Sequence, residues 1–569
     1  MGNFKDIATR NELADFLGFP RRKLSYILYV KSTDAYYQSF TIPKKSGGER
    51  CINAPTGDLK DIQKKLAMAL WKHQLDIRTS RNIRTNISHA FEKGKGIISN
   101  AQIHRNKRYV LNLDLKNFFS SFHFGRVKGY FEKNRDFELP NQVATVIAQL
   151  TCFQGCLPQG APTSPIITNM ICQILDMKLL RIAKRYKLDY SRYADDLTFS
   201  TNNRAFLGMQ SEFYEDVAKE VTSAGFTINE KKTRLQYKDS KQVVTGLIVN
   251  KKLNVDRIYA RKTKAMAHTL YTNGEYTIDG KIGTLKQLEG RFAFINQLDK
   301  YNNKRDGKGE HKGWNLNSRE KQYQKFLFYK YFFSNSKPII VTEGKTDVVY
   351  MKAALRKLHA EYPCLIERKP DGTFEYHVSF LKRSKRLSYF LHISQDGADT
   401  MKNLFNFFSP TSDNKRVYPD YLTYFMKAGN CSAQNPVILV FDNELSSKNK
   451  PIKKFSDHVK LDDVRRETLK RILHLKLIDK GNLYLLTNPL VDGKDECEIE
   501  DLFDENTLSQ VIDGRTFSRD IKKGDTQHYG KETFSMFVSR NHMNIDFSRF
   551  REMLNILNEI IGLYHKPEV

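Results

Sequence analysis

Hydrophobic and polar residues alternate on both sides of residues 194–196. Residues 188–193 carry Leu and Tyr side chains at intervals, and residues 197–200 read Leu, Thr, Phe and Ser. A period of two is typical of strands that bury one face, so the pattern predicts a strand, a tight turn and a second strand. Asp195 and Asp196 fall at the tip of this hairpin.

Two further segments of the first half have clear patterns. Residues 109–113 are nearly all apolar and run into Asp114, which predicts a buried strand that ends in a carboxylate. Residues 155–165 form a loop interrupted by Gly and Pro, and residues 166–186 have the period of a helix. This junction is predicted to steady a nucleotide with free N–H groups, or to be an ordinary capped helix, or both.

Residues 40–52 are predicted to form a basic hairpin. Two extended runs flank a Gly-Gly turn, and they carry Lys44, Lys45 and Arg50. Basic side chains on a rigid hairpin suit the oxygens of a triphosphate. A solvated surface is the commoner explanation of such a pattern and stays open.

From residue 337 the pattern changes to short apolar strands followed by turns and helices. Strands are predicted at residues 338–342, 389–393, 436–441 and 482–486. Strands that alternate with helices favour a parallel sheet covered by helices.

Acidic residues follow several of these predicted strands. In parallel sheets, chemistry collects at the carboxyl ends of the strands. Glu343, Asp442 and Glu444 fall there, and Glu500 and Asp501 are further candidates.

The composition indicates an anionic partner. Lys and Arg total 93 against 64 Asp and Glu, a formal net charge of +29. Such an excess favours nucleic acid or an anionic membrane surface. The sequence has no run of 18 apolar residues, which argues against a membrane-spanning helix. With 569 residues, the chain is expected to fold as two to four domains.

The cysteines and the first residues bear on the compartment. The seven cysteines are scattered, and Cys152 and Cys156 have no second pair with which to complete a zinc site. The first residues lack the apolar stretch of a secretory signal. We therefore expect reduced thiols and a cytoplasmic protein. The sequence leaves the oligomeric state open, and a homo-oligomer is one of the alternatives.

Two adjacent carboxylates at a hairpin tip repel each other, and a fold keeps such a pair when a cation lies between them. Hard oxygen ligands suit Mg²⁺, which takes one or two carboxylates together with substrate phosphates. Asp114 would supply the third acid of a site in which two ions lie roughly 4 Å apart.

Four motifs occur in the order found in reverse transcriptases, and the first 335 residues resemble that family. The motifs are Asp114 with Phe119, Leu157 to Pro165, Tyr193-Ala-Asp-Asp196, and Asn229 to Thr233. The resemblance implies an α+β right-hand polymerase. Residues 1–250 would form its fingers and palm, and residues 251–335 its helical thumb.

The resemblance also implies roles for individual residues. Asp114 and Asp195 would bind both catalytic Mg²⁺ ions, with Asp196 assisting and the Leu115 carbonyl as a further ligand. Lys232 would lie near the pyrophosphate as a candidate acid.

The remaining implied roles concern the incoming nucleotide. Phe119 would be a steric gate against the ribose 2′-OH. The implied nucleotide-binding residues are Lys45, Arg50, Gln159 and Gly160. Lys45 and Arg50 would meet the triphosphate, with Lys44 as the alternative to Lys45.

Two more motifs narrow the resemblance to bacterial retron reverse transcriptases. Asn100-Ala-Gln-Ile-His104 matches the Asn-Ala-x-x-His box of these enzymes, and Val244-Thr245-Gly246 matches their Val-Thr-Gly box. Both would bind RNA, although Val-Thr-Gly taken alone is equally three residues of a strand. The resemblance implies a short DNA copied from a cognate structured RNA, primed from a 2′-OH of that RNA and left branched (msDNA).

Residues 337–569 resemble a Toprim domain, the α/β fold shared by topoisomerases, primases and overcoming-lysogenisation-defect nucleases. The resemblance rests on a strand followed by Glu343 and on Asp442-Asn-Glu444, where Glu stands in place of the usual second Asp. It implies that Glu343, Asp442 and Glu444 bind Mg²⁺ or Mn²⁺. Lys531 would steady charge on the phosphate being cut.

The two resemblances together imply a retron polymerase fused to a nuclease effector in anti-phage defence. Its partners would be the cognate RNA, the msDNA and dNTPs, with no membrane. The msDNA would restrain a nuclease that is otherwise toxic. Two alternatives stay open: a polymerase with an inert Toprim scaffold, and a group II intron-like maturase. The Asn-Ala-x-x-His box argues against the maturase, as does the lack of a recognisable endonuclease finger with paired cysteines.

Overall fold

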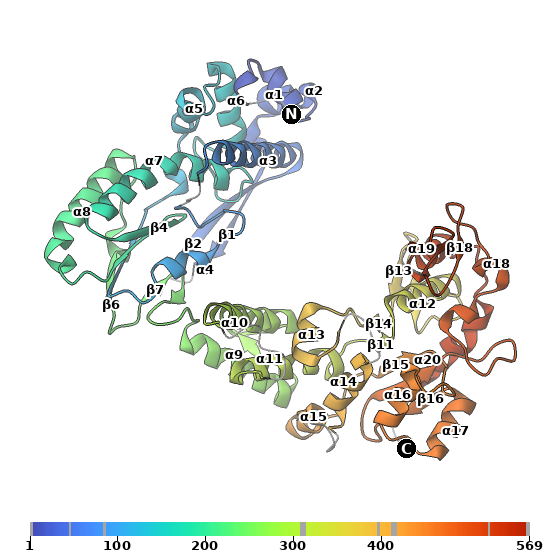
Figure 1. Ribbon diagram of the computed structural model, residues 1–569. Helices are drawn as coiled ribbons and strands as arrows, with labels where there is room; N and C mark the ends of the chain where they lie inside the picture. The colour runs from blue at the N-terminus through green and yellow to red at the C-terminus, as the bar shows by residue number, and fades with distance from the viewer. Residues whose placement is uncertain are drawn as a thin grey trace. The chain divides into compact units, whose positions relative to one another are not determined.

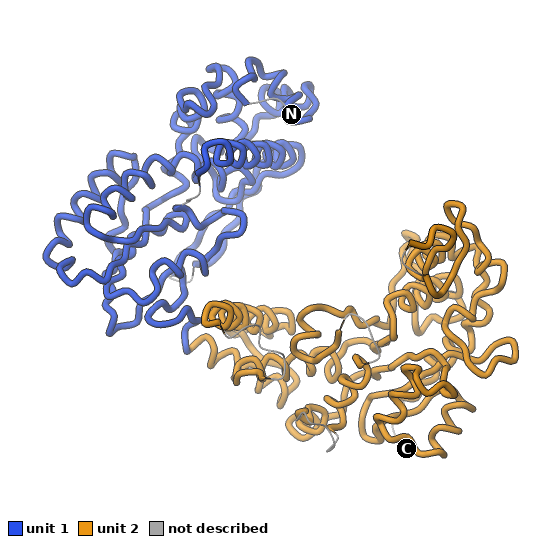
Figure 2. The backbone as a smooth tube through the Cα atoms, in the orientation of Figure 1, with its two compact units in different colours: residues 1–257 blue, residues 258–569 orange. Residues whose placement is uncertain are grey.

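The computed structural model describes residues 4–44, 47–83, 87–307, 315–394, 399–410, 418–521 and 524–564. The chain divides into two compact units, residues 1–257 and residues 258–569 (Figure 2). Each unit has its own main sheet and its own hydrophobic core.

The first unit is built around a four-stranded antiparallel sheet of order β4-β5-β3-β6 (Figure 1). Its strands are β1 (Tyr37–Pro43), β2 (Glu49–Pro55), β3 (Tyr109–Asp114), β4 (Asp189–Tyr193), β5 (Asp196–Thr201), β6 (Arg234–Tyr237), β7 (Val243–Val244) and β8 (Leu247–Ile248). Its helices are α1 (Arg10–Phe16), α2 (Arg21–Ser25), α3 (Gly57–Ser80), α4 (Ile97–Ile103), α5 (Phe124–Lys133), α6 (Asn141–Thr151), α7 (Ser164–Arg185) and α8 (Phe206–Ser223).

Alternation along β3 gives this sheet two different faces. Leu111 and Leu113 are buried in the core that the helices share. Successive side chains of a strand point to opposite faces, so Asn112 and Asp114 lie on the other face. The alternation therefore turns the Asp114 carboxylate away from the helical core.

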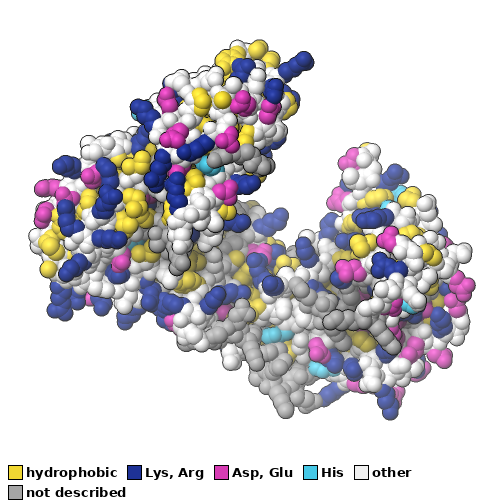
Figure 3. All heavy atoms as spheres, turned by 45° about the horizontal axis from the view of Figure 1, so that its top comes forward, with side chains coloured by type: hydrophobic (Ala, Val, Ile, Leu, Met, Phe, Trp, Pro, Cys, Tyr) yellow, Lys and Arg dark blue, Asp and Glu magenta, His cyan; other side chains and the backbone are white. Residues whose placement is uncertain are grey.

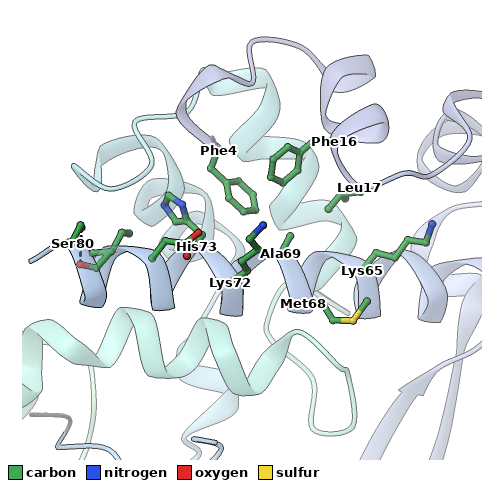
Figure 4. A pocket seen from close by; sticks show the side chains of 11 residues that line it. Phe4, Phe16, Leu17, Lys65, Met68, Ala69, Lys72, His73 and Ser80 are labelled. Carbon is green, nitrogen blue, oxygen red and sulfur yellow. Dashed lines mark hydrogen bonds between the residues drawn. The ribbon is translucent and has the colours of Figure 1, made fainter. Parts of the chain in front are cut away.

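A separate cavity of about 710 Å³ lies between α3 and the N-terminal residues (Figure 4). Phe4, Phe16 and Leu17 line it from one side, and Met68 and Ala69 line it from α3. The lining contains none of the carboxylates proposed to be catalytic.

The second unit holds a five-stranded sheet of order β14-β11-β15-β17-β16. Its strands are β9 (Thr277–Ile278), β10 (Lys281–Ile282), β11 (Ile339–Thr342), β12 (Ile366–Arg368), β13 (Phe374–Tyr376), β14 (Ser379–Phe380), β15 (Val437–Phe441), β16 (His474–Lys476), β17 (Leu483–Thr487), β18 (Thr516–Phe517) and β19 (His528–Tyr529). Its helices are α9 (Arg257–Asn273), α10 (Leu285–Arg305), α11 (Ser318–Phe328), α12 (Lys345–Lys357), α13 (Lys385–Leu391), α14 (Asp399–Phe408), α15 (Tyr421–Gly429), α16 (Pro451–His458), α17 (Asp463–Ile472), α18 (Glu505–Leu508), α19 (Lys531–Asn541) and α20 (Arg551–Tyr564).

This sheet is buried between two layers of helices. Ile339 and Val341 of β11 belong to one core with side chains of α9–α11 and α13–α16. Ile340 belongs to the opposite core, with side chains of α12, α19 and α20. Strands covered on both faces read as continuous apolar runs, as residues 338–342 and 436–441 do. The helices that the resemblance assigned to a thumb thus share a core with this sheet.

Two features of the second unit differ from the sequence predictions. β16 pairs antiparallel with β17, so the sheet is parallel only from β14 to β17. The strand predicted at residues 389–393 is wrong, because residues 385–391 form α13. The Ser384 hydroxyl accepts a hydrogen bond from the Leu387 N–H at 3.3 Å and caps this helix. Leu387, Phe390 and Leu391 are buried at helical spacing. A short apolar run such as residues 389–393 does not by itself distinguish a strand from a buried helix.

Surface chemistry agrees with the composition. Lys and Arg side chains are spread over the face seen in Figure 3. All seven cysteines are free. Among the described residues, no helix has the length and apolar character needed to cross a bilayer.

Candidate active sites

Strand register brings three carboxylates of the first unit together. Asp114, at the end of β3, lies opposite Asp196, the first residue of β5. Asp195 lies in the two-residue turn between β4 and β5, and its carbonyl accepts a hydrogen bond from the Leu115 N–H at 2.9 Å. Residues far apart in the sequence therefore form one acidic cluster.

The turn that carries Asp195 is strained. Ala194 has a φ of 57°, in the left-handed region that glycine favours. Strain of this kind persists only where the surrounding structure imposes it. Here Arg192 Nη1 donates to the Ala194 carbonyl at 3.2 Å.

Arg192 is itself held by a buried ion pair. Its side chain is fully buried and donates two 2.8 Å hydrogen bonds to the Asp176 carboxylate of α7. Tyr190 donates to the same carboxylate at 2.9 Å. We infer that Arg192 and Asp176 position the Asp195 turn. Neither was among the predicted site residues, and the only sequence signal was a charged residue at an inward position of each element.

Nearby positive charge offsets the repulsion within the acidic cluster only in part. Burial, together with the charges of Asp195 and Asp114, raises the pKa of Asp196 to about 7. Burial is also the main cause that raises the pKa of Asp195, with Asp114 adding to it. Such a set of hard oxygen donors fits a divalent cation, which would relieve the repulsion.

Asp114 already has two partners. Asn229 Nδ2 donates to its carboxylate at 3.0 Å, and Lys232 Nζ lies 3.1 and 3.0 Å from its two oxygens. The Asn229 N–H also donates to the Asp114 carbonyl at 2.8 Å. The Asn-x-x-Lys-Thr motif thus folds back onto the first acid.

The basic hairpin predicted at residues 40–52 is the antiparallel pair β1–β2. Arg50 lies close enough to Asp195 for its charge to lower the pKa of that carboxyl. Lys45 lies outside the described residues.

The loop after α6 packs on this hairpin. The Gln159 carbonyl accepts a hydrogen bond from the Asn53 N–H at 2.8 Å. Gly160 has a φ of 119°, and a Cβ there would come within 2.9 Å of the Asn53 carbonyl and of Ile52. Glycine is therefore required where this loop meets β2. The Gln159 side-chain oxygen is buried and has no hydrogen-bond partner among the described residues.

A groove of about 560 Å³ starts at the acids and runs to the β7–β8 hairpin. Asp114 and Asp196 line one part of it, and Thr245 and Gly246 line another. Three basic side chains also line it: Lys232, Arg234 and Lys241. Such a groove suits a nucleic-acid strand beside the acids.

Phe119 follows β3 in a short 3-10 helix, Phe119–Ser121. Its ring is half-buried and packs edge-on against Phe118 with centroids 5.4 Å apart. Packing of this kind fixes the ring beside the strand that ends at Asp114.

The Asn-Ala-x-x-His box is placed differently from the prediction. Asn100 and His104 are both 0% exposed, so neither is accessible to RNA in this structure. His104 contacts the hydroxyls of Ser200 and Ser191 at 2.8 and 2.7 Å, and the Ser191 hydroxyl donates to Asn100 at 2.7 Å. These hydrogen bonds tie α4 to the strands of the acidic hairpin.

The Val-Thr-Gly box forms the turn between β7 and β8. Val244 is buried, whereas Thr245 and Gly246 have φ values of 46° and 80° and line the groove. Two successive positive φ values are typical of a tight hairpin turn. Of the five residues predicted to bind RNA, only the turn residues Thr245 and Gly246 are accessible.

We expect the buried His104 to make folding sensitive to pH. Burial lowers the pKa of His104 to about 3, against about 6.5 in an unfolded chain. The unfolded state therefore binds more protons below pH 6.5, so stability falls as the pH falls from there toward 3. When the pH falls from about 7.5 to about 5.5, the free energy of unfolding of the wild type should decrease by about 1.4 kcal/mol more than that of His104→Gln.

Unfolding monitored by hydrogen exchange of β4 and β5 at both pH values measures this difference. The exposed His268 gives a matched control, because His268→Gln should keep the wild-type dependence. An equal pH dependence in His104→Gln and the wild type would show that His104 is not the titrating group.

The second unit holds a separate acidic cluster at the carboxyl ends of two parallel strands. β11 and β15 are in register from Ile339↔Val437 to Thr342↔Val440, so Glu343 and Asp442 emerge side by side. The Asp442 N–H donates to the Glu343 carboxylate at 3.3 Å. The Asp442 carboxylate accepts hydrogen bonds from Asn488 Nδ2 and from the Ile499 N–H, both at 2.8 Å.

Two acids that were not among the predicted site residues complete this cluster. Burial, followed by the charge of Asp347, raises the pKa of Glu343 to about 8. Burial is also the main cause that raises the pKa of Asp442 far above its usual range, with Glu343, Asp347 and Glu500 adding to it. Asp347 lies one helical turn after Glu343, a spacing that could have indicated it. Glu500 was noted only as a further candidate.

Lysines neutralise the rim of this cluster. Lys450 forms an ion pair with the buried Glu444. Lys531 Nζ lies 3.1 Å from Glu498 and 3.0 Å from the fully buried Glu500. The structure therefore brings Glu343, Asp442, Glu444 and Lys531 into one neighbourhood.

Both clusters are acidic without forming a finished metal site. Over the described ranges, no three or more His, Cys, Asp or Glu side chains are arranged to hold a metal ion. The lysines at Asp114, Glu444 and Glu500 offer a reason, since each occupies oxygens that a cation would take.

Comparisons with known proteins relate the first unit to polymerases. The family described as "Reverse transcriptase (RNA-dependent DNA polymerase)" matches residues 42–264. The retron Mx162 reverse transcriptase of Myxococcus xanthus is 33% identical over 328 residues, which cover 52% of this chain and 64% of that protein. The retron Ec86 reverse transcriptase of Escherichia coli is 30% identical over 281 residues, which cover 49% of this chain and 81% of that protein.

A likeness to a solved structure is weaker. The apo telomerase of Candida tropicalis truncated from its C-terminal domain aligns over 42% of this chain and 61% of its own. The sequence identity is 16% and the TM-score 0.30. The match to the polymerase family ends at residue 264, before the second sheet begins. The chain spans less than two thirds of the M. xanthus relative.

Proposed function

The chain belongs to the retron reverse transcriptase family, and from that membership we propose that it is an RNA-directed DNA polymerase. The observation that carries the proposal is the register that sets Asp114 opposite Asp196, with Asp195 in the adjoining turn. Three neighbouring carboxylates, of which Asp114 is buried and Asp195 and Asp196 are partly buried, are the kind of oxygen ligands that nucleotidyl transfer by two metal ions uses.

The chain's own residues would bind and orient the reactants. Asp114 and Asp195 would hold Mg²⁺ with Asp196 and the Leu115 carbonyl in support. When bound, Mg²⁺ would activate the attacking hydroxyl and steady the leaving pyrophosphate. Lys232 forms an ion pair with Asp114 in this structure. In the proposal it would leave Asp114, turn toward the pyrophosphate and donate a proton to it. Positioning and charge neutralisation would supply most of the rate.

Nucleotide selection would depend on three places around the acids. The Phe119 ring would occupy the space of a ribose 2′-OH and so favour deoxynucleotides. Arg50 would contact the triphosphate from β2, together with Lys45 or, as the alternative, Lys44. Gln159 and Gly160 would contact the nucleotide from the loop that packs on β2.

We further propose that the template is a cognate structured RNA and the product a branched DNA–RNA molecule. The relatives named above are retron enzymes, and the basic groove ending at Thr245 and Gly246 would hold the priming RNA. The basic helices α9 and α10 would contact a duplex through phosphates and 2′-OH groups, which suits A-form RNA.

For the second unit we propose a metal-dependent Toprim nuclease. Support comes from the hydrogen bond between Glu343 and Asp442 at the ends of parallel strands, where such chemistry collects. Glu343, Asp442 and Glu444 would hold Mg²⁺ or Mn²⁺, with Asp347 and Glu500 beside them. Lys531 would steady the phosphate being cut. In this proposal the DNA–RNA product restrains the nuclease, and disturbance of the product by a phage releases it.

Two other functions would use the same residues differently. In one, the second unit is an inert scaffold, which the replacement of the usual Asp by Glu444 and its ion pair with Lys450 favour. In the other, the chain is a maturase that folds an intron RNA. The family membership favours a retron enzyme over a maturase.

Nucleic acid that copurifies with the chain tests the polymerase proposal. We expect cells that carry the gene with its flanking DNA to yield a short DNA whose end bears an RNA stub after RNase treatment. Sequencing of the branch nucleotide would identify the priming 2′-OH. Recovery of RNA alone, or of linear DNA without the stub, would contradict the proposal.

A further inference from the structure

A basic cavity of about 640 Å³ lies within the second unit, and neither proposed active site uses it. Its walls come from α10, from the segment of α11 and the π-helix Tyr329–Phe333, and from the start of α13. Four basic side chains line it: Lys300, Lys382, Lys385 and Arg386. We call these residues together with Asn296, Tyr323 and Tyr331 the junction pocket.

The positive charge of the junction pocket is only partly neutralised. Glu289 pairs with Arg386 at 2.5 Å, and its other oxygen pairs with Lys330 at 2.5 Å. Lys300 lies 4.7 Å from the ring centroid of Tyr389. Among the described residues, no carboxylate forms an ion pair with Lys300, Lys382 or Lys385. An anion would therefore find three lysines available.

Tyr323, one of the residues that line the pocket, has a buried hydroxyl that lacks a partner. Tyr323 is 1% exposed, and its hydroxyl has no hydrogen-bond partner within the described part of the chain. The ring is fixed by stacking on Phe292, with centroids 5.4 Å apart, and by edge contact with Phe390 at 4.8 Å. An unsatisfied buried hydroxyl is costly, and a ligand oxygen would satisfy it. The amide oxygen of Asn296 is unpartnered in the same way.

We propose that the junction pocket binds a phosphate-bearing ligand, either a stretch of nucleic-acid backbone or a free nucleotide. Lysine ammonium groups and a tyrosine O–H all donate to phosphate oxygens, and bonds from charged donors are the strong ones. The Asn296 amide oxygen would accept from a sugar hydroxyl or a base N–H. Both sources share the phosphate, and the experiment below separates them.

The pocket is connected to the second acidic cluster. Arg383, between Lys382 and Ser384, donates to the carbonyl of Thr342, the last residue of β11. Glu343 follows directly. A ligand held on residues 382–386 would thus fix the strand end that carries Glu343. This link rests on the proposed nuclease, whereas binding itself does not.

Hydrogen exchange on the full chain, purified free of nucleic acid, tests the binding. The probes are dATP and a short single-stranded DNA oligonucleotide, each titrated alone. We expect protection of peptides covering residues 293–300 and 382–391. Protection by the oligonucleotide at far lower concentration identifies the backbone as the ligand, and protection by dATP identifies a nucleotide.

Variants show whether the pocket itself is responsible. The double variant Lys382→Gln with Lys385→Gln should bind the protecting ligand with an affinity lower by at least about tenfold. Tyr323→Phe, which removes only the hydroxyl, should lower the affinity for the same ligand about threefold or more. Lys427→Gln with Lys454→Gln removes the same charge from exposed positions on α15 and α16 and should leave the affinity unchanged. The proposal fails if no probe protects these peptides, or if pocket and control variants bind equally. Neither readout depends on polymerase or nuclease activity.

Discussion

The Asp195→Asn variant should incorporate radiolabelled dNTP into the branched product roughly a thousandfold more slowly than the wild type. Asparagine keeps the size of the side chain but removes the charge that would hold a divalent cation. Loss of one fixed electrostatic contact in an active site has effects of this order. The measurement is primer extension on the cognate RNA by the full-length protein.

The fold should survive this change. Repulsion from Asp114 contributes to the raised pKa of Asp195, so removing one charge relieves the cluster. We expect an unfolding temperature equal to that of the wild type or higher. Asp189→Asn is the matched control, because Asp189 lies on the same hairpin but pairs with Lys107 at the surface. If Asp195→Asn retains wild-type incorporation, the cluster is not the polymerase site.

The acids of the proposed polymerase site could be located from the sequence because each lies at or beside the end or start of a short, strongly patterned strand. Alternation in residues 197–200 and the apolar run before Asp114 fix the strands locally. The antiparallel pairing that sets Asp114 opposite Asp196 then follows from how such strands meet. The acids Glu343 and Asp442 were predicted for the same reason, since both follow strands buried on two faces.

Residues that act through long-range packing could not be predicted in this way. Asn100 and His104 read as an exposed motif, yet their partners Ser191 and Ser200 lie about ninety residues away. Arg192 lies at an inward position of its strand, but the sequence alone does not show that Asp176 of α7 lies beside it. A buried polar residue is recognisable only once its partner is known.

The sequence also did not show which core the helices of the expected thumb belong to. Helices α9–α11 bury side chains such as Tyr271, Tyr323 and Phe328 in the core that also contains Val341 of β11. Periodicity shows that a helix has an apolar face but does not show what covers it. Residues 258–335 therefore share a packed core with the second sheet and belong to the same compact unit.

The Glu343→Gln variant should abolish the effects attributed to the second unit. Glu343 would hold the cation that polarises the phosphate, and its loss should slow cleavage roughly a hundredfold or more. Cells that express the chain without its RNA should then grow normally, and cells with the whole system should lose protection against phage. Plating efficiency and growth curves measure both effects, and nicking of labelled DNA and RNA with Mg²⁺ or Mn²⁺ measures cleavage directly.

The stability of this variant separates lost chemistry from lost structure. The pKa of Glu343 is about 8, so near neutral pH without a cation the carboxyl is mostly protonated, and glutamine resembles that form. The glutamine oxygen can still accept from the Asp442 N–H. Because the folded state holds this proton more tightly than the unfolded state, wild-type stability should fall as pH rises from about 4.5 to about 8. Glu343→Gln should lack that component. Glu361→Gln, at a surface pair with Arg551, should behave as the wild type in every assay. Unchanged phage protection in a well-folded Glu343→Gln protein would favour the inert scaffold over the nuclease.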